Sequence, residues 1–161
     1  MIREQLPPIS LAGPDRHRLE TLARHAIEEG HPVGGFLLAE VRRATICGED
    51  DLPPNVVRVN NWVTFRVDWG FPSESRMLVY PDEYRNAEAQ LSVLSPLGAA
   101  LVGLRAGSRM PYFSVEGMLH VATAESLDPP IGLLSLLRLP APPRGAAEAF
   151  FDSDDPGPAA A

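Results

Sequence analysis

Two adjacent carboxylates, Glu28 and Glu29, are the first residues of this sequence that could do chemistry, because they end a stretch with helical periodicity. Such a pair could share a magnesium ion with the carboxylates of a partner, since this ion takes few protein oxygens besides water and phosphate. Carboxylates are unfavourable at the negative end of a helix dipole, which slightly favours a functional role. An ordinary solvated helix end is the simpler interpretation, and both stay open.

Other catalytic and metal-binding patterns do not occur in the sequence. The histidines show no H-x-x-x-H or H-x-H spacing, and Cys47 is the only cysteine, which excludes a disulfide framework and a thiolate cluster. Ser95 lacks the G-x-S-x-G context of a nucleophile, and the glycines after it do not lead into a P-loop. We therefore predict no catalytic residue, no bound metal and no cofactor. The four histidines are His17, His25, His31 and His120.

The carboxylate pair is positioned by a predicted antiparallel helical hairpin over residues 14–47, which follows an extended lead-in at residues 1–13. Pro14 suits a first helical turn. An apolar stripe with helical spacing precedes a turn at residues 30–35, and a second stripe follows it. The first stripe consists of Leu19, Leu22, Ala23, Ala26 and Ile27. The narrow stripes favour a short coiled coil.

After an acidic linker at residues 48–54, the hydrophobic period changes from helical to two. Residues 63–69, 76–80 and 91–94 read as strands, and Trp69 falls on the apolar side of the first. Ser95 and Pro96 mark the start of a helix that we expect to end at Gly107. A hairpin of residues 109–115 and 118–125 follows. These elements predict an α+β fold, with an antiparallel sheet and one packed helix forming a separate domain at residues 55–127.

Composition and charge limit the class of protein. The chain has 161 residues with 45% hydrophobic and 22% charged side chains, typical of a globular protein. Its formal charge is −7 and no basic stripe is visible, so we expect no direct sequence-specific contact with nucleic acid. No apolar run reaches the length of a membrane span, and we expect a cytoplasmic protein without membrane contact. The Pro/Ala-rich stretch at residues 128–161 predicts a largely disordered tail.

One long motif is specific enough to suggest a family. Residues 91–107 read LSVLSPLGAALVGLRAG, with LVYP at 78–81, LPPNVV at 52–57 and NNWVTF at 60–65. This pattern resembles the C-terminal domain of the GreA/GreB transcript-cleavage factors, and is most similar to the Rnk type, in which a shortened helical hairpin precedes the same domain. The resemblance implies an FKBP-like α+β domain after an antiparallel coiled coil, and binding to bacterial RNA polymerase near its secondary channel.

The resemblance also assigns provisional roles to residues. It implies that the sheet domain docks on polymerase while the hairpin points inward, and in cleavage factors acidic residues at the tip hold a catalytic magnesium ion. A short hairpin cannot reach that far, so we predict a non-catalytic transcription modulator that competes with GreA/GreB-type factors. The alternatives are a cleavage factor that donates acidic tip residues and a stand-alone protein-interaction module. The candidate contacts are Glu28, Glu29 and His31 at the tip, and Tyr80, Pro81, Ser95, Pro96 and Leu97 on the docking domain.

Aromatic residues leave two further interpretations open. An FKBP-like fold raises prolyl isomerase activity as a rival function, which would need a pocket lined by rings. Aromatic side chains on strands are usually core residues, and we expect this of most of them. Trp62 and Tyr84 are instead candidate exposed anchors for a partner. The ring candidates are Phe65, Trp69, Tyr80, Tyr112 and Phe113.

Overall fold

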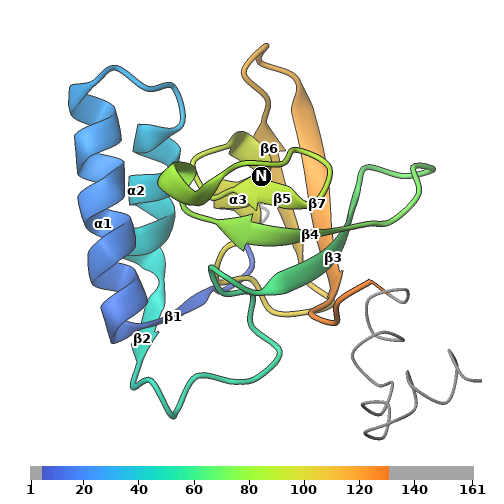
Figure 1. Ribbon diagram of the computed structural model, residues 1–161, viewed down its shortest axis with the longest axis horizontal. Coiled ribbons are helices and arrows are strands. Elements are labelled where there is room, and N and C mark those ends of the chain that lie inside the picture. Colours follow the sequence, from blue (N-terminus) through green and yellow to red (C-terminus); the bar gives the residue numbers. More distant parts are fainter. Residues whose placement is uncertain (1–4, 131–161) are drawn as a thin grey trace, which may run out of the picture. The chain divides into compact units, whose positions relative to one another are not determined.

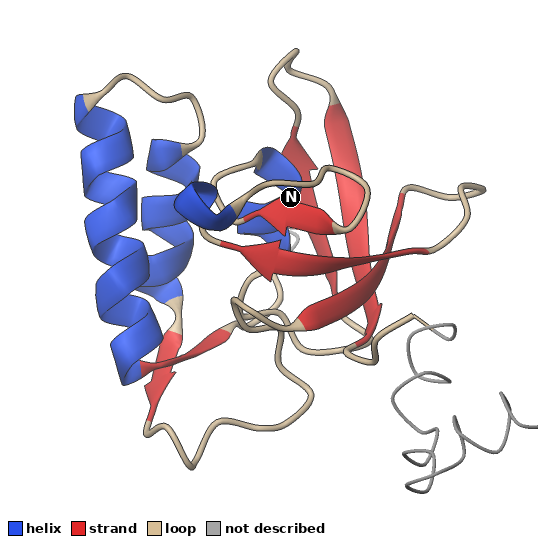
Figure 2. Cartoon of the chain, viewed as in Figure 1, coloured by secondary structure: helices blue, strands red, loops and turns tan. Residues whose placement is uncertain are grey.

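The computed structural model describes residues 5–130, and the tail predicted at residues 128–161 lies almost entirely outside them. The described chain has an α+β fold in which a helical pair precedes a curled sheet with one short helix (Figures 1 and 2). The helices are α1 (Gly13–Glu28), α2 (Gly34–Arg43) and α3 (Pro96–Leu101), with a single 3-10 turn at Pro81–Glu83. The strands are β1 (Ser10–Ala12), β2 (Thr45–Cys47), β3 (Trp62–Val67), β4 (Glu74–Val79), β5 (Gln90–Ser92), β6 (Arg109–Phe113) and β7 (Leu119–Ser126).

The helical hairpin differs from the prediction at its base. Helix α2 ends at Arg43, and the next residues form β2, which pairs in parallel with β1 through Ser10 and Thr45. Residues 10–12 of the predicted lead-in therefore form a strand, and the hairpin does not stay helical to residue 47. Thr45 and Ile46 are β-branched and suit a strand. The short parallel pair joins the chain entering α1 to the chain leaving α2.

The close approach of the two helices depends on Gly34 at the start of α2. A Cβ atom placed there would lie 2.8 Å from the backbone nitrogen of Ile27 in α1. Leu19, Ala23 and Ala26 of α1 are buried as their spacing predicts, whereas Ile27, placed in the same stripe by the sequence, is 45% exposed. The buried stripe of α1 therefore ends at Ala26, one residue earlier than expected.

The main sheet has the strand order β5-β4-β3-β7-β6. Strands β3, β4, β6 and β7 pair antiparallel, but β5 pairs in parallel with β4, so the predicted all-antiparallel sheet is wrong at this edge. Strand β3 ends at Val67 because Asp68 adopts a left-handed conformation with φ 57°. The turn carries Trp69 out of the core to 71% exposure, which corrects its predicted place on the apolar side.

Helix α3 begins where predicted and ends early. The Ser95 hydroxyl accepts a hydrogen bond from the backbone N–H of Gly98 at 3.1 Å, the expected N-cap. The helix ends at Leu101 rather than at Gly107, because Gly103 takes φ 78° and its N–H donates to the carbonyl of Val57. Backbone pairing with a distant segment therefore replaces the last predicted turns.

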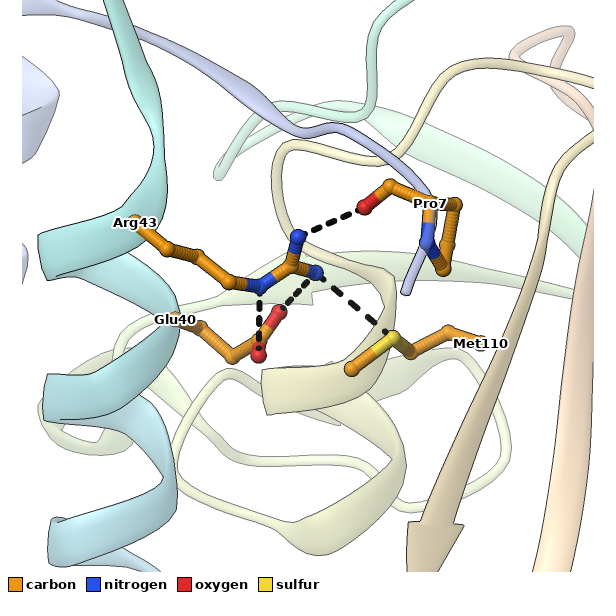
Figure 3. A network of polar contacts seen from close by, with 4 residues as sticks. All are labelled: Pro7, Glu40, Arg43 and Met110. Carbon is orange, nitrogen blue, oxygen red and sulfur yellow. Dashed lines mark hydrogen bonds and ion pairs between the residues drawn. The ribbon is translucent and has the colours of Figure 1, made fainter. Parts of the chain in front are cut away.

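The hairpin and the sheet share one hydrophobic core, which corrects the prediction of a separate domain at residues 55–127. Buried side chains of α1 and α2 form one cluster with those of β3, α3 and β7. A buried ion pair supports this joint (Figure 3): Glu40, only 2% exposed, receives two hydrogen bonds from Arg43, from Nε at 2.9 Å and from Nη2 at 2.7 Å. Arg43 also donates to the carbonyl of Pro7 at 2.6 Å and lies 3.7 Å from the sulfur of Met110 in β6. Helix α2 is thereby tied to the N-terminal segment and to the sheet.

Candidate partner-binding surface

The tip of the helical hairpin exposes Glu28, Glu29 and His31. Glu29 follows the last turn of α1, and its carboxylate lies 3.1 Å from Nε2 of His25, with both side chains 65% exposed. His31 turns back into the hairpin, where its Nδ1 accepts a hydrogen bond from the N–H of Val33 at 3.2 Å. Two of the three predicted tip residues therefore have local structural contacts.

The predicted docking residues divide into buried and accessible ones. Tyr80 is only 4% exposed, and the Arg18 guanidinium lies 3.8 Å from the centre of its ring. Burial raises the pKa of Tyr80 above its ordinary value. The hydroxyl of Ser95 is fully used as a cap, since it also donates to the carbonyl of Ser92 at 2.6 Å. The accessible members are Pro81, Pro96 and Leu97, all half-buried.

A shallow groove runs between α1 and the segment that follows β4. It has a volume of about 650 Å³ and joins Glu29 of the tip with Tyr80 and Pro81 of the docking set. Its other walls carry both signs of charge, including Arg18 and Asp82. We call it the α1 groove. It is lined by His17, Arg18, Thr21, Leu22, His25, Glu29, Tyr80, Pro81, Asp82 and Leu94.

A second groove of about 480 Å³ lies between the hairpin tip and β6. It brings Pro96 of the docking set beside Pro32 and Val33, which follow the tip. None of its lining residues is charged, and we call it the apolar groove. It is lined by Leu6, Pro32, Val33, Phe36, Pro96, Met110, Pro111, Tyr112, Phe113, Ser114, Val115 and Leu119. The structure thus brings Glu29 near Tyr80 and Pro81, and Pro96 near the tip, whereas Glu28, His31, Ser95 and Leu97 line neither groove.

Sequence reasoning missed the strongest exposed apolar cluster. Phe113, Val115, Met118 and Leu119 surround the β6–β7 turn and are each more than 60% exposed. Phe113 was expected in the core, as strand aromatics usually are, and that expectation is wrong for it. The available signal was the turn itself, because Val115 and Met118 flank Glu116-Gly117 where polar residues are the rule. Phe65, Tyr80 and Tyr112 are buried as expected.

The candidate partner anchors behave differently from each other. Tyr84 is 39% exposed in the loop after β4, and Trp62 is half-buried on β3. Tyr112 packs against His120, with ring centres 5.6 Å apart, and burial raises the pKa of its hydroxyl to about 12. Across residues 5–130, no three side chains of His, Cys, Asp or Glu come together in a way that could hold a metal ion.

Comparison with known proteins identifies the family. The family described as "Transcription elongation factor, GreA/GreB, C-term" matches residues 52–122. The "Regulator of nucleoside diphosphate kinase" of Escherichia coli K12 is 38% identical over 106 residues, which cover 66% of this chain and 78% of that protein. The chain belongs to the GreA/GreB family.

Two further comparisons agree with this membership. The "Regulator of nucleoside diphosphate kinase" of Shigella flexneri shows the same 38% identity over 106 residues, 66% of this chain and 78% of that protein. A solved structure, "Prokaryotic transcription elongation factor GreA/GreB from Nitrosomonas europaea", superposes with a TM-score of 0.59 and 30% identity. It covers 73% of this chain and 97% of that one. This GreA/GreB-family chain is therefore related to transcription factors, and two of its relatives carry the name of a regulator. Within residues 5–130, no helix has the length and apolar character needed to cross a membrane.

Proposed function

We propose that this GreA/GreB-family chain is a non-catalytic transcription modulator that binds bacterial RNA polymerase near the secondary channel and competes with GreA/GreB-type factors. The observation that carries the proposal is that the helical hairpin is short and packs against the sheet. Helix α1 has 16 residues and α2 has 10, which correspond to about 24 Å and 15 Å. Their inner faces belong to the same core as the sheet, so little of this length projects beyond it.

This geometry argues against delivery of a catalytic carboxylate into polymerase. Stimulating cleavage would require a tip carboxylate to be placed within a fraction of an ångström of its working position. Here Glu29 lines the same groove as Tyr80 and Pro81, and Pro32 lies beside Pro96. The tip therefore stands next to the proposed docking residues rather than far ahead of them. A partner that contacts Pro81 or Pro96 would meet the tip at the same surface.

We assign docking on polymerase to the α1 groove. Its walls combine the apolar faces of Leu22, Pro81 and Leu94 with charged groups, a composition suited to a reversible protein contact. Arg18 is held over the Tyr80 ring and lies 3.8 Å from the Glu83 carboxylate, so its guanidinium has a defined place in the groove. The proposed contacts of this site are Arg18 and Pro81, which lie beside the buried Tyr80.

A competition assay with core polymerase tests the proposal. We expect the full chain to bind core polymerase, to stimulate no transcript cleavage in backtracked complexes, and to inhibit cleavage by a GreA-type factor. Pro81→Asp should remove most of the inhibition. The chain should stay folded, because Pro81 opens a 3-10 turn where an acidic residue is tolerated. The matched control is Pro72→Asp on an exposed loop, which should inhibit like the unmodified protein.

The alternative functions give different results in the same assay. A cleavage factor is favoured by one observation, the exposure of both Glu28 and Glu29 at the tip. Cleavage by this protein alone that disappears in the Glu28→Ala/Glu29→Ala double variant would overturn the proposal in its favour. Failure to bind core polymerase at all would favour a stand-alone interaction module. Under the proposal, the double variant competes within about twofold of the unmodified protein, less than 1 kcal/mol.

A further inference from the structure

The end of the β6–β7 hairpin is an ordered apolar projection. Phe113, Val115, Met118 and Leu119 are 66%, 67%, 63% and 61% exposed, and we call these four residues the knob. Their turn is closed by hydrogen bonds, from the Ser114 N–H to the Met118 carbonyl at 2.9 Å and from the Met118 N–H to the Ser114 hydroxyl at 3.1 Å. The exposed side chains are thus held in place by their backbone. Contiguous exposed apolar patches on a protein surface often mark an interface.

The knob stands directly beside a cavity of matching character. Phe113, Val115 and Leu119 form one wall of the apolar groove, and Pro32, Val33 and Phe36 of the helical hairpin line another part of it. Its volume of about 480 Å³ lies in the range of sites that accept several bulky groups. None of its lining residues carries a charge. One copy of the chain therefore presents a projection and a hollow of the same chemistry, side by side.

We propose that the knob and the apolar groove form the interface of a two-fold symmetric homodimer, in which the knob of each copy fills the groove of the other. A two-fold axis requires a surface that complements itself, and an apolar projection next to an apolar hollow meets that requirement. A stable interface takes about 800 Å² from each partner. The four knob side chains and the groove walls provide an apolar centre for such an area, with Leu6, 45% exposed, beside them.

Charge favours this face for self-association. Each copy carries a formal charge of −7, so two copies repel each other wherever their acidic surfaces meet. The centres of protein interfaces are depleted of charged side chains, as the knob and groove are here. Glu116 lies in the exposed turn between Val115 and Met118, where a rim residue would remain in water. The α1 groove, with Glu29 and Asp82 in its walls, would bring like charges together instead.

After the knob, the described chain runs away from the groove along β7. Strand β7 runs from Leu119 at the knob to Ser126, about 23 Å at the rise of a strand. The described chain then continues past Asp128, whose carbonyl lies 3.5 Å from the hydroxyl of Thr64 on β3. The described chain therefore ends beyond the end of β7 that lies away from the knob, and the crosslinking test below distinguishes the tail from a second copy. A dimer would also cover Pro96, a candidate docking residue that lines the groove. This consequence rests on the proposed function, whereas the dimer itself does not.

Sedimentation velocity on the full chain over a concentration series tests the dimer. We expect the mass to rise from one chain to two between about 1 and 100 µM. Phe113→Ser should weaken dimerisation at least tenfold, and Met118→Asp should abolish it, while circular dichroism shows a folded protein. The matched control is Phe71→Ser, which removes an equally exposed ring, 61% accessible, from the β3–β4 loop. It should leave the dimerisation constant within twofold of that of the unmodified chain.

Several results would overturn the proposal. It fails when the unmodified chain stays monomeric over the whole series, or when Phe71→Ser dissociates the dimer as strongly as Phe113→Ser. A photo-crosslinking residue at position 118 identifies which molecule or segment the knob contacts. Covalent products of two chains joined near positions 32–36 support the dimer. A link within one chain to residues 131–161 identifies the tail as the occupant, and a link formed only to added polymerase identifies the enzyme; either result rejects the dimer.

Discussion

The α1 groove and the apolar groove are two faces of the same joint between hairpin and sheet, yet they differ in chemistry. The α1 groove is lined by charged and titratable side chains, among them Arg18, Glu29 and Asp82. The apolar groove has no charged side chain in its lining. The two faces are therefore suited to different partners, because one provides charge-dependent contacts and the other provides burial. A short hairpin laid against a sheet can create both without projecting from the domain.

The largest expected effect removes both grooves at once. Leu101 of α3 is fully buried beneath the sheet, and Leu101→Asp places an unpaired charge in the core shared by hairpin and sheet. We expect a loss of at least about 3 kcal/mol in the free energy of unfolding. Urea denaturation followed by circular dichroism measures it. Phe71→Asp, at a position 61% exposed and outside both grooves, is the control and should cost less than about 1 kcal/mol.

A smaller effect is expected when the joint is loosened at the buried ion pair. Arg43→Met leaves the carboxylate of Glu40 buried without its partner, and we expect a loss of about 2–3 kcal/mol, less than for a fully buried pair because Arg43 is a quarter exposed. The double variant Glu40→Leu/Arg43→Met should recover most of this loss. Thermal denaturation of the three proteins provides the comparison. A single variant as stable as the unmodified chain would show that the pair does not hold the hairpin.

Salt should distinguish the two grooves directly. Raising the ionic strength shortens the Debye length from about 10 Å at 0.1 M to 3 Å at 1 M, which weakens exposed charge contacts but not apolar burial. We expect polymerase binding through the α1 groove to weaken several-fold, and dimerisation through the apolar groove to stay constant or strengthen. Arg18→Ala should reduce the salt dependence of polymerase binding. Equal salt dependence of both equilibria would mean that the partners are assigned to the wrong grooves.

The smallest expected effect is on the acid stability of the β3–β4 loop, which also carries the control residues Phe71 and Pro72. Nδ1 of His120 lies 2.8 Å from the Asp68 carboxylate, which can accept its N–H, and the N–H of Val121 donates to the same carboxylate at 2.9 Å. These bonds, that of His120 first, hold the pKa of Asp68 below its ordinary value. A depressed folded-state pKa stabilises the protein above the unfolded value, near 4, and this contribution is lost as the pH falls through the lower folded value.

The expected measurement is the melting temperature between about pH 5 and 2. The unmodified protein should lose stability on acidification more steeply than Asp68→Asn, whose amide oxygen can still accept from Val121. If the melting temperatures of the two proteins fell equally on acidification, this assignment would be wrong. At neutral pH the variant should leave both polymerase binding and dimerisation unchanged, since Asp68 lines neither groove.

Local sequence signals predicted the elements well where they depend on near neighbours. Ser95 caps α3, as a serine followed by proline indicates, because the bond it accepts from Gly98 spans only three residues. The alternation around Val63 and Phe65 marked β3 and its buried face correctly. Among the site residues, Pro81 and Pro96 were proposed from the family motif, and each lines a groove. The sequence alone could not distinguish a partner contact at Ser95 from its role as the N-cap of α3.

What the sequence alone determined is therefore the order and type of the three α-helices and of the strands of the main sheet, the N-cap of α3 and the family motif, since each depends on interactions within a few residues or on a local pattern. The tertiary structure decided the parallel pairings of β1 with β2 and β4 with β5, the early end of α3 at its contact with Val57, and the packing of the hairpin onto the sheet. It also decided that Phe113 is exposed whereas Phe65 is buried. These outcomes depend on contacts between residues far apart in the chain, where the same apolar side chain fits a core or a surface according to what packs against it.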